Sequence, residues 1–160
     1  MRSIILLLFF VSSYAGAQDL KLIKATKQMI NSGASPTSTT NYTIQVKKSK
    51  KCSLTIDSVV NVYTQKSGKF TVFKEGNPSV LSPASQQQID ASNIKEKGIF
   101  NINFSSSKNR GSGRPGAPPM ELMVPIADYT QGAIVYYRVG KKKKKLTIES
   151  FEELETINAP

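Results

Sequence analysis

A repeated alternation of apolar and polar residues most constrains the fold of this chain. Successive side chains of a β-strand point to opposite faces of a sheet, so alternation gives a strand one apolar and one polar face. In residues 41–48, NYTIQVKK, the side chains of Tyr42, Ile44 and Val46 share one face. The other runs that we interpret as strands are residues 52–63, 69–74, 98–105, 120–124, 132–140 and 145–150.

Seven runs of this kind, rich in β-branched and aromatic residues and separated by turn residues, indicate an all-β protein. Their short spacing predicts a single-domain antiparallel β-sandwich, Ig-like in architecture, with seven to eight strands. The eighth strand would be residues 20–33, where an edge strand is favoured over a helix although the apolar residues fit neither period cleanly.

Two long polar loops interrupt the pattern, residues 75–98 and 105–119. A short helix remains an alternative for residues 84–91 within the first loop. In residues 150–155, SFEELE, a serine and a glutamate stand three residues apart, which is the spacing of a capping box. We therefore also expect a short helical turn near the C-terminus.

The first 17 residues have the layout of a secretory signal peptide. Arg2 precedes an apolar core that runs from Ile4 to Val11, and a small-x-small site ends at Ala17. We therefore expect export to the periplasm or the cell exterior, and a domain of residues 18–160 without a transmembrane segment or a lipid anchor. Removing residues 1–17 takes away Arg2 and no acid, so the net charge falls by one, from +11 to +10.

The composition argues against an enzyme. The chain contains no His and no Trp, and it has a single Cys. The absence of His excludes Ser-His-Asp and Cys-His nucleophile pairs and all His metal sites. The spacing of the carboxylates does not bring two of them together as glycoside hydrolysis requires. The sequence thus predicts no catalytic residue, no metal and no cofactor.

Two runs of lysine carry much of the positive charge, and both lie between predicted strands. Each is interpreted as a hairpin tip, either a solvated turn or a site that attracts phosphate or carboxylate groups. Lysine is a point charge and neither run contains Arg, so bidentate phosphate recognition is not expected. The candidate anion-binding residues are Lys47, Lys48, Lys50, Lys51, Lys141, Lys142, Lys143, Lys144 and Lys145.

Topology decides whether the two runs act together. With strict up-and-down alternation through all the predicted strands, the two turns fall at opposite ends of the molecule. If residues 120–124 are only an extended connection, both turns fall at the same end and form one strongly positive pole. The sequence leaves both arrangements open.

Three further residues are candidates for contacts. Cys52 has the same parity as Leu54 and Ile56, so it is expected to point into the core, although nearby lysines would favour a reactive thiolate. Tyr136 and Tyr137 face opposite sides of one strand. We expect one of them in the core, and we assign Tyr137, together with Tyr129, to an exposed protein-contact patch.

Several stretches together resemble small exported β-sandwich proteins of Bacteroidetes bacteria. They are the signal peptide, a polar hairpin that ends in TNYTIQV, then LTIDSVVNV, FTVFK and AIVYYRVGKKKKKLTIESFEEL. The resemblance implies export and a β-sandwich fold. It implies no activity, because proteins of this kind have none assigned and the stretches contain no catalytic signature.

The sequence therefore predicts a non-catalytic binding or structural module whose partner is a protein or an anionic cell surface. The alternative is a binder of anionic surfaces such as lipid head groups, acidic glycans or extracellular nucleic acid, through the lysine runs. Nucleic acid is the least favoured of these, because no aromatic residue inside either run could stack on a base.

Overall fold

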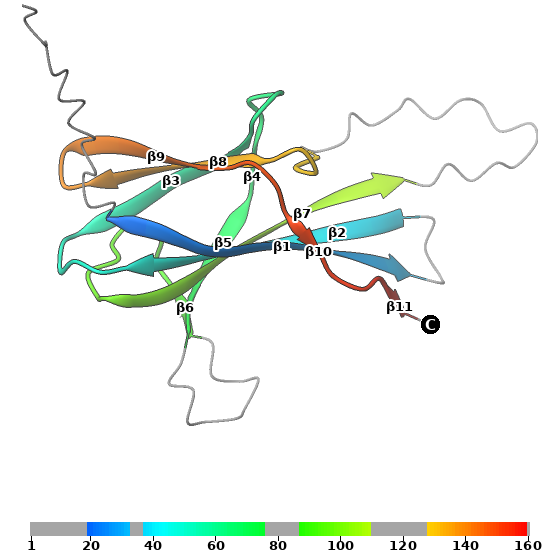
Figure 1. Ribbon diagram of the computed structural model, residues 1–160, viewed down its shortest axis with the longest axis horizontal. Coiled ribbons are helices and arrows are strands. Elements are labelled where there is room, and N and C mark those ends of the chain that lie inside the picture. Colours follow the sequence, from blue (N-terminus) through cyan, green and yellow to red (C-terminus); the bar gives the residue numbers. More distant parts are fainter. Residues whose placement is uncertain (1–18, 33–36, 76–86, 110–127, 160) are drawn as a thin grey trace, which may run out of the picture.

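The described part of the chain is built from strands. The computed structural model describes residues 19–32, 37–75, 87–109 and 128–159, and these residues contain no helix. Their strands form two sheets, one of seven strands and one of four, which lie one above the other (Figure 1). The prediction of an all-β fold is confirmed, whereas the signal-peptide residues 1–17 lie outside the described part.

The larger sheet has the strand order β10-β1-β2-β7-β5-β6, and β11 also pairs with β1. Its strands are β1 (Leu20–Ser32), β2 (Thr37–Lys48), β5 (Phe70–Lys74), β6 (Gln87–Ile89), β7 (Gly98–Asn109), β10 (Glu152–Glu153) and β11 (Ile157–Ala159). The two short C-terminal strands run parallel to β1 and the other pairs are antiparallel. A bulge between Leu22 and Lys24 shifts the register of β1 on β2.

The smaller sheet has the strand order β4-β3-β8-β9, all antiparallel. Its strands are β3 (Leu54–Asn61), β4 (Ser67–Gly68), β8 (Ala133–Val139) and β9 (Lys142–Ile148). β2 and β3 follow one another in the chain but belong to different sheets, so residues 49–53 carry the chain from one sheet to the other.

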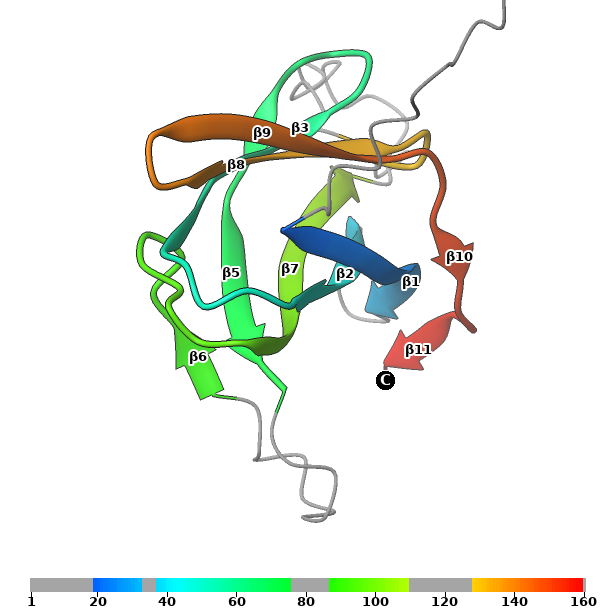
Figure 2. The same ribbon diagram turned by 60° about the vertical axis from the view of Figure 1, so that its left-hand side comes forward.

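Buried side chains of both sheets form one hydrophobic core. On β2 the buried apolar residues are Tyr42, Ile44 and Val46, the three that alternation places on one face. The Tyr42 ring stacks on Phe104 of β7 with 5.2 Å between ring centroids, and both rings make edge contacts with Phe151. Figure 2 shows that the C-terminal segment descends from β9 along the side of both sheets, which brings Phe151 into the core.

The structure corrects several expectations for individual segments. Residues 150–155 form no helical turn, because Glu152–Glu153 pair with β1 as β10. Residues 87–89 are a strand where a short helix was the alternative, and the described loop residue Ile94 is buried against Leu54. β7 continues to Asn109, into the expected second loop. The expected strand at residues 120–124 lies outside the described residues.

Residues 20–32 form a strand, as favoured from the sequence, but not a simple edge strand. β1 pairs with β2 on one side, and β10 and β11 cover parts of its other side. The backbone N–H of Leu154 also donates to the carbonyl of Lys27 at 2.9 Å. The C-terminal segment thus provides hydrogen-bond partners for backbone groups of β1 that would otherwise lie unpaired at an edge of the sheet.

Candidate functional site

Both lysine runs lie at the same end of the molecule, where β2 ends, β3 begins and β8 turns into β9 (Figure 1). Leu54, the first residue of β3, pairs with Val139, the last residue of β8. The backbone N–H of Gly140 donates to the carbonyl of Ser53 at 3.3 Å. The connection from β2 to β3 therefore lies directly beside the turn between β8 and β9.

The strand order explains why the two runs meet. β8 begins on the side of the molecule where β7 ends (Figure 1), so β8 runs back toward the end where β2 ends and β3 begins. Of the two arrangements that the sequence leaves open, the structure has the one with a shared end.

A single carboxylate, that of Asp19, joins the two runs. Asp19 lies just before β1, and its side chain is 5 % exposed. Its Oδ1 lies 3.2 Å from Nζ of Lys50 in the first run, and its Oδ2 pairs with Nζ of Lys144 in the second. The hydrogen bond from Lys144 lowers the pKa of Asp19 and outweighs the opposite effect of burial. The same hydrogen bond raises the pKa of Lys144.

Lys48 has a structural role instead of the anion-binding role that the sequence suggests. It is 1 % exposed, and its ammonium donates to the carbonyls of Lys50 (2.7 Å), Lys95 (3.1 Å) and Glu96 (3.0 Å). An ammonium has three donors, so none remains for an external anion. Burial lowers the pKa of Lys48. Its parity with Tyr42 and the other inward residues of β2 is the sequence signal that could have found this role.

Neither lysine run is the hairpin tip that we expected. The first run connects β2 and β3, which belong to different sheets, and the second run belongs mostly to a strand. Gly140 and Lys141 form the turn, and the remaining four lysines belong to β9. Lys143 and Lys145 are exposed, whereas Lys144 is half-buried and reaches Asp19. β9 is an edge strand of the smaller sheet, and charged side chains on such a strand oppose pairing with a second chain.

Three lysines outside the two runs join the same surface. Lys21 lies opposite Lys47 in the register of β1 and β2, and Lys95 and Lys97 line a hollow of about 570 Å³ together with Lys51. These three lysines are distant from the runs along the chain, so the local sequence does not indicate that they belong to this surface. We call the exposed lysines of this surface the lysine-rich end: Lys21, Lys47, Lys50, Lys51, Lys95, Lys97, Lys141, Lys142, Lys143 and Lys145.

Cys52 lines the same hollow and is only half-buried. It lies two residues before β3 begins, and its Sγ is 3.9 Å from the carbonyl oxygen of Lys50. Alternation places Cys52 on the inner face, but the regular strand starts later than expected. The thiol therefore lies at the rim of the core.

The structure contradicts the expected tyrosine contact patch. Tyr129 is 0 % exposed and Tyr137 is 3 % exposed, so neither forms an exposed surface. The Tyr129 hydroxyl donates to the carbonyl of Val59 at 3.3 Å, and burial raises the pKa of both tyrosines. Tyr136 is the exposed member of the pair, at 36 %. The positions of Tyr136 and Tyr137 on one strand predict that one of the two rings is buried. In the structure the buried ring is that of Tyr137 and not that of Tyr136.

Comparisons with protein-family models, curated proteins and solved structures found no match to this chain. The resemblance to small exported proteins of Bacteroidetes thus stays a prediction from the sequence. Within the described ranges, no helix is long and apolar enough to cross a membrane. The same residues include no group of three or more His, Cys, Asp or Glu side chains that could hold a metal ion.

Proposed function

We propose that this chain is an exported, single-domain β-sandwich, Ig-like in architecture, that acts as a non-catalytic binding module. Its lysine-rich end docks on a membrane surface that carries anionic lipid head groups. The signal-peptide layout of residues 1–17 supports export. The two sheets that share one core support the sandwich.

The observation that carries the proposal is the carboxylate of Asp19, which contacts a lysine from each run. Two runs almost a hundred residues apart in the chain are thereby fixed as one surface. Exposed lysines near an anionic membrane surface each contribute about 1 kcal/mol of binding free energy. Several such lysines on one surface bind far more strongly than either run alone, because their contributions are summed.

An exposed apolar residue near this surface favours a lipid surface over an acidic glycan. Ile23 is 45 % exposed and lies at the bulge of β1, two residues from Lys21. Proteins that lie on the membrane interface combine basic residues with apolar side chains that enter the head-group region, and Ile23 could serve as such a side chain here. Contact with the isoleucine side chain would contribute much less binding free energy with a glycan than with the acyl chains of a membrane.

Flotation with lipid vesicles tests the proposal. We expect the protein to bind vesicles that contain 30 mol% phosphatidylglycerol in phosphatidylcholine, and not vesicles of phosphatidylcholine alone. Binding should weaken as NaCl rises, because salt screens the lysines. A double variant with one change in each run, Lys51→Ser with Lys142→Ser, should lose about 2 kcal/mol, or roughly thirtyfold in affinity.

A matched control removes the same charge elsewhere. Lys66 and Lys69 are exposed and lie beyond the other end of β3, so Lys66→Ser with Lys69→Ser should bind vesicles nearly as well as the unaltered protein. Equal losses in the two double variants would show that only net charge matters. Ile23→Ser should weaken vesicle binding and leave retention on heparin unchanged. Retention on heparin without any binding to vesicles would reject the lipid surface.

A further inference from the structure

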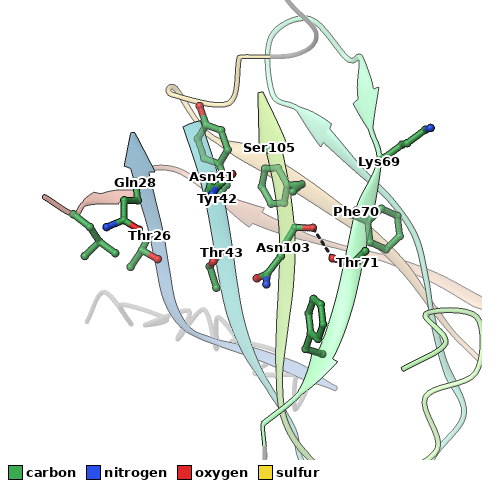
Figure 3. A pocket seen from close by; sticks show the side chains of 13 residues that line it. Thr26, Gln28, Asn41, Tyr42, Thr43, Lys69, Phe70, Thr71, Asn103 and Ser105 are labelled. Carbon is green, nitrogen blue, oxygen red and sulfur yellow. Dashed lines mark hydrogen bonds between the residues drawn. The ribbon is translucent and has the colours of Figure 1, made fainter. Parts of the chain in front are cut away.

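A second surface with different chemistry lies on the outer face of the larger sheet. A groove of about 530 Å³ crosses β1, β2, β7 and β5 there. Thr26, Thr43, Asn103 and Thr71 form one row across the four strands, because each pairs with the next in the register. Figure 3 shows these four labelled side chains side by side on the strands that line the groove.

The groove is lined almost entirely by uncharged side chains, in contrast to the rest of this basic chain. The next row consists of Gln28, Asn41 and Ser105, which also line it. Lys69 is the one charged residue among the described lining residues, and no carboxylate is among them. Amides and hydroxyls both donate and accept hydrogen bonds. This lining therefore suits a neutral ligand with many hydroxyl groups, rather than an ion.

Two amide oxygens on this face have no hydrogen-bond partner. The Oδ1 atoms of Asn101 and Asn103 are buried and unpaired among the described residues. Asn101 is 6 % exposed and lies one row from Asn103, on the same face of β7. A buried acceptor without a donor costs about 1–3 kcal/mol. The Asn103 side chain lines the groove, so a rotation that turns its oxygen outward would let a ligand hydroxyl supply the missing donor.

Apolar side chains stand on two sides of the polar floor. Phe73 of β5 lies on one side, and Leu154 of the C-terminal segment lies on the other. Leu154 is 37 % exposed and is held there by the hydrogen bond from its N–H to the carbonyl of Lys27. The volume of the groove falls in the range of small-molecule sites, about 300–1,000 Å³. These two side chains stand on opposite sides of four strands, so an elongated ligand of several rings could reach both, whereas a single ring could not.

We propose that this groove binds an uncharged oligosaccharide. The hydroxyl groups of the sugar donate to the amide oxygens and exchange hydrogen bonds with the threonine and serine hydroxyls. The C–H faces of separate sugar rings of the oligosaccharide pack on Phe73 and on Leu154. A site built to hydrogen-bond hydroxyl groups discriminates strongly against ligands that lack them. Binding here is independent of the lysine-rich end, so it neither requires nor excludes docking on a membrane.

Titration of the isotope-labelled protein with neutral hexasaccharides, followed by NMR, tests this proposal. The probes are cellohexaose, xylohexaose, maltohexaose and mannohexaose, each up to 10 mM in 0.3 M NaCl. We expect at least one of them to shift the amide signals of β2, β7 and β5 around Thr43, Asn103 and Thr71. No shift with any probe, or shifts confined to other strands, would overturn the proposal. Shifts that depend on protein concentration alone would show that a second copy occupies the groove instead.

Variants locate the site. Asn103→Ala removes one unpaired oxygen and should lower the affinity for the responding sugar at least tenfold, and Phe73→Ala should do the same. The matched control is Ser107→Ala, because Ser107 lies on the same strand and the same face but outside the groove. The Lys51→Ser/Lys142→Ser protein should bind the sugar normally. Unchanged affinity in both groove variants, with NMR spectra that show an intact fold, would overturn the assignment.

Discussion

At the scale of single residues, two charged side chains with inward parity organise the lysine-rich end. Lys48 has the parity of the buried residues of β2, and Lys144 has the parity of Leu146 and Ile148 on β9. Each is held by oxygen atoms: Lys48 by three carbonyls and Lys144 by Asp19. Burying a charge is costly unless it is paired. At this end the two inward lysines therefore stabilise local structure, whereas outward lysines such as Lys47, Lys143 and Lys145 are exposed to solvent.

Asp19→Asn should destabilise the protein and change its pH dependence. The hydrogen bond from Lys144 lowers the pKa of Asp19 in the folded state, below the value of about 3.9 for an unfolded aspartate. Asp19 therefore adds stability that is fully present above about pH 4 and is lost as the pH falls through the folded-state pKa. We expect a loss of about 1–3 kcal/mol at pH 7, measured by urea unfolding.

The Asn variant should also lose less stability than the unaltered protein when the pH is lowered from 5 to 3. Asp57→Asn serves as a control, because Asp57 forms an ion pair with Arg138 at 2.7 Å that is much more exposed to solvent. It should destabilise the protein less than Asp19→Asn does. An Asp19→Asn protein as stable as the unaltered one at pH 7 would contradict a structural role for this carboxylate.

At the scale of elements, the turn before β8 and the turn after β8 each need a glycine, for different reasons. Gly132, just before β8, has a φ of 120°, and a Cβ there would lie 2.6 Å from the carbonyl oxygen of Ile148. Gly140, between β8 and β9, has a φ of 59°, but a Cβ there would meet nothing within 4 Å. The first glycine is required by both conformation and space, and the second by conformation alone.

Gly132→Ala should therefore cost much more stability than Gly140→Ala. Backbone strain and the clash with β9 together should lower the free energy of unfolding by about 3 kcal/mol for Gly132→Ala. Strain alone should cost about 1 kcal/mol for Gly140→Ala. Urea unfolding of the two variants measures both values. Equal losses would contradict the close approach of Gly132 to the β9 backbone.

The C-terminal segment shows how tertiary pairing overrides a local signal. Ser150 and Glu153 have the spacing of a capping box, yet Glu152 and Glu153 pair with Thr26 and Lys27 of β1. Phe151 is buried against Tyr42 and Phe104, and Nζ of Lys27 lies 3.2 Å from the Glu153 carboxylate. An exposed helical turn would forgo this burial and leave the edge of β1 open. The apolar contact and the backbone pairing together outweigh a single cap, which contributes about 1 kcal/mol.

At the scale of the whole molecule, positive charge is in excess, with 22 Lys and Arg residues against 11 Asp and Glu. Part of this excess gathers at the lysine-rich end, where Lys21 and Lys47 lie directly opposite one another on paired strands. Like charges in this position are destabilising. The molecule therefore carries a surface on which like charges lie close together, and their repulsion lowers the stability of the protein.

Salt should stabilise the free protein. Raising NaCl from 0.01 M to 0.3 M shortens the screening length from about 30 Å to less than 10 Å, which weakens the repulsion among these lysines. We expect the melting temperature to rise by about 3 °C, or roughly 1 kcal/mol. The variant Lys142→Gln/Lys143→Gln/Lys145→Gln should melt higher than the unaltered protein at low salt and respond less to NaCl. A melting temperature that falls with salt would show that ion pairs such as those of Asp19 outweigh the repulsion.

The sequence by itself determined the longer described strands and most of their inward faces. Alternation is a local property, because the side-chain period of a strand is two wherever the strand lies. It placed Tyr42, Ile44 and Val46 in the core. The same alternation implies that Lys48 points inward, which we did not use in predicting its role. Residues 1–17 and 120–124 lie outside the described part of the chain, so the expectations for them stay predictions.

Only the tertiary structure decided which charged residues meet. Whether two distant turns share an end depends on the strand order and on the passage of residues 49–53 between the sheets, and neither is encoded in local periodicity. The contact of Asp19 with both Lys50 and Lys144 and the uncharged rows across β1, β2, β7 and β5 arise in the same way. Each depends on non-local strand pairing, which fixes positions in space that sequence spacing leaves open.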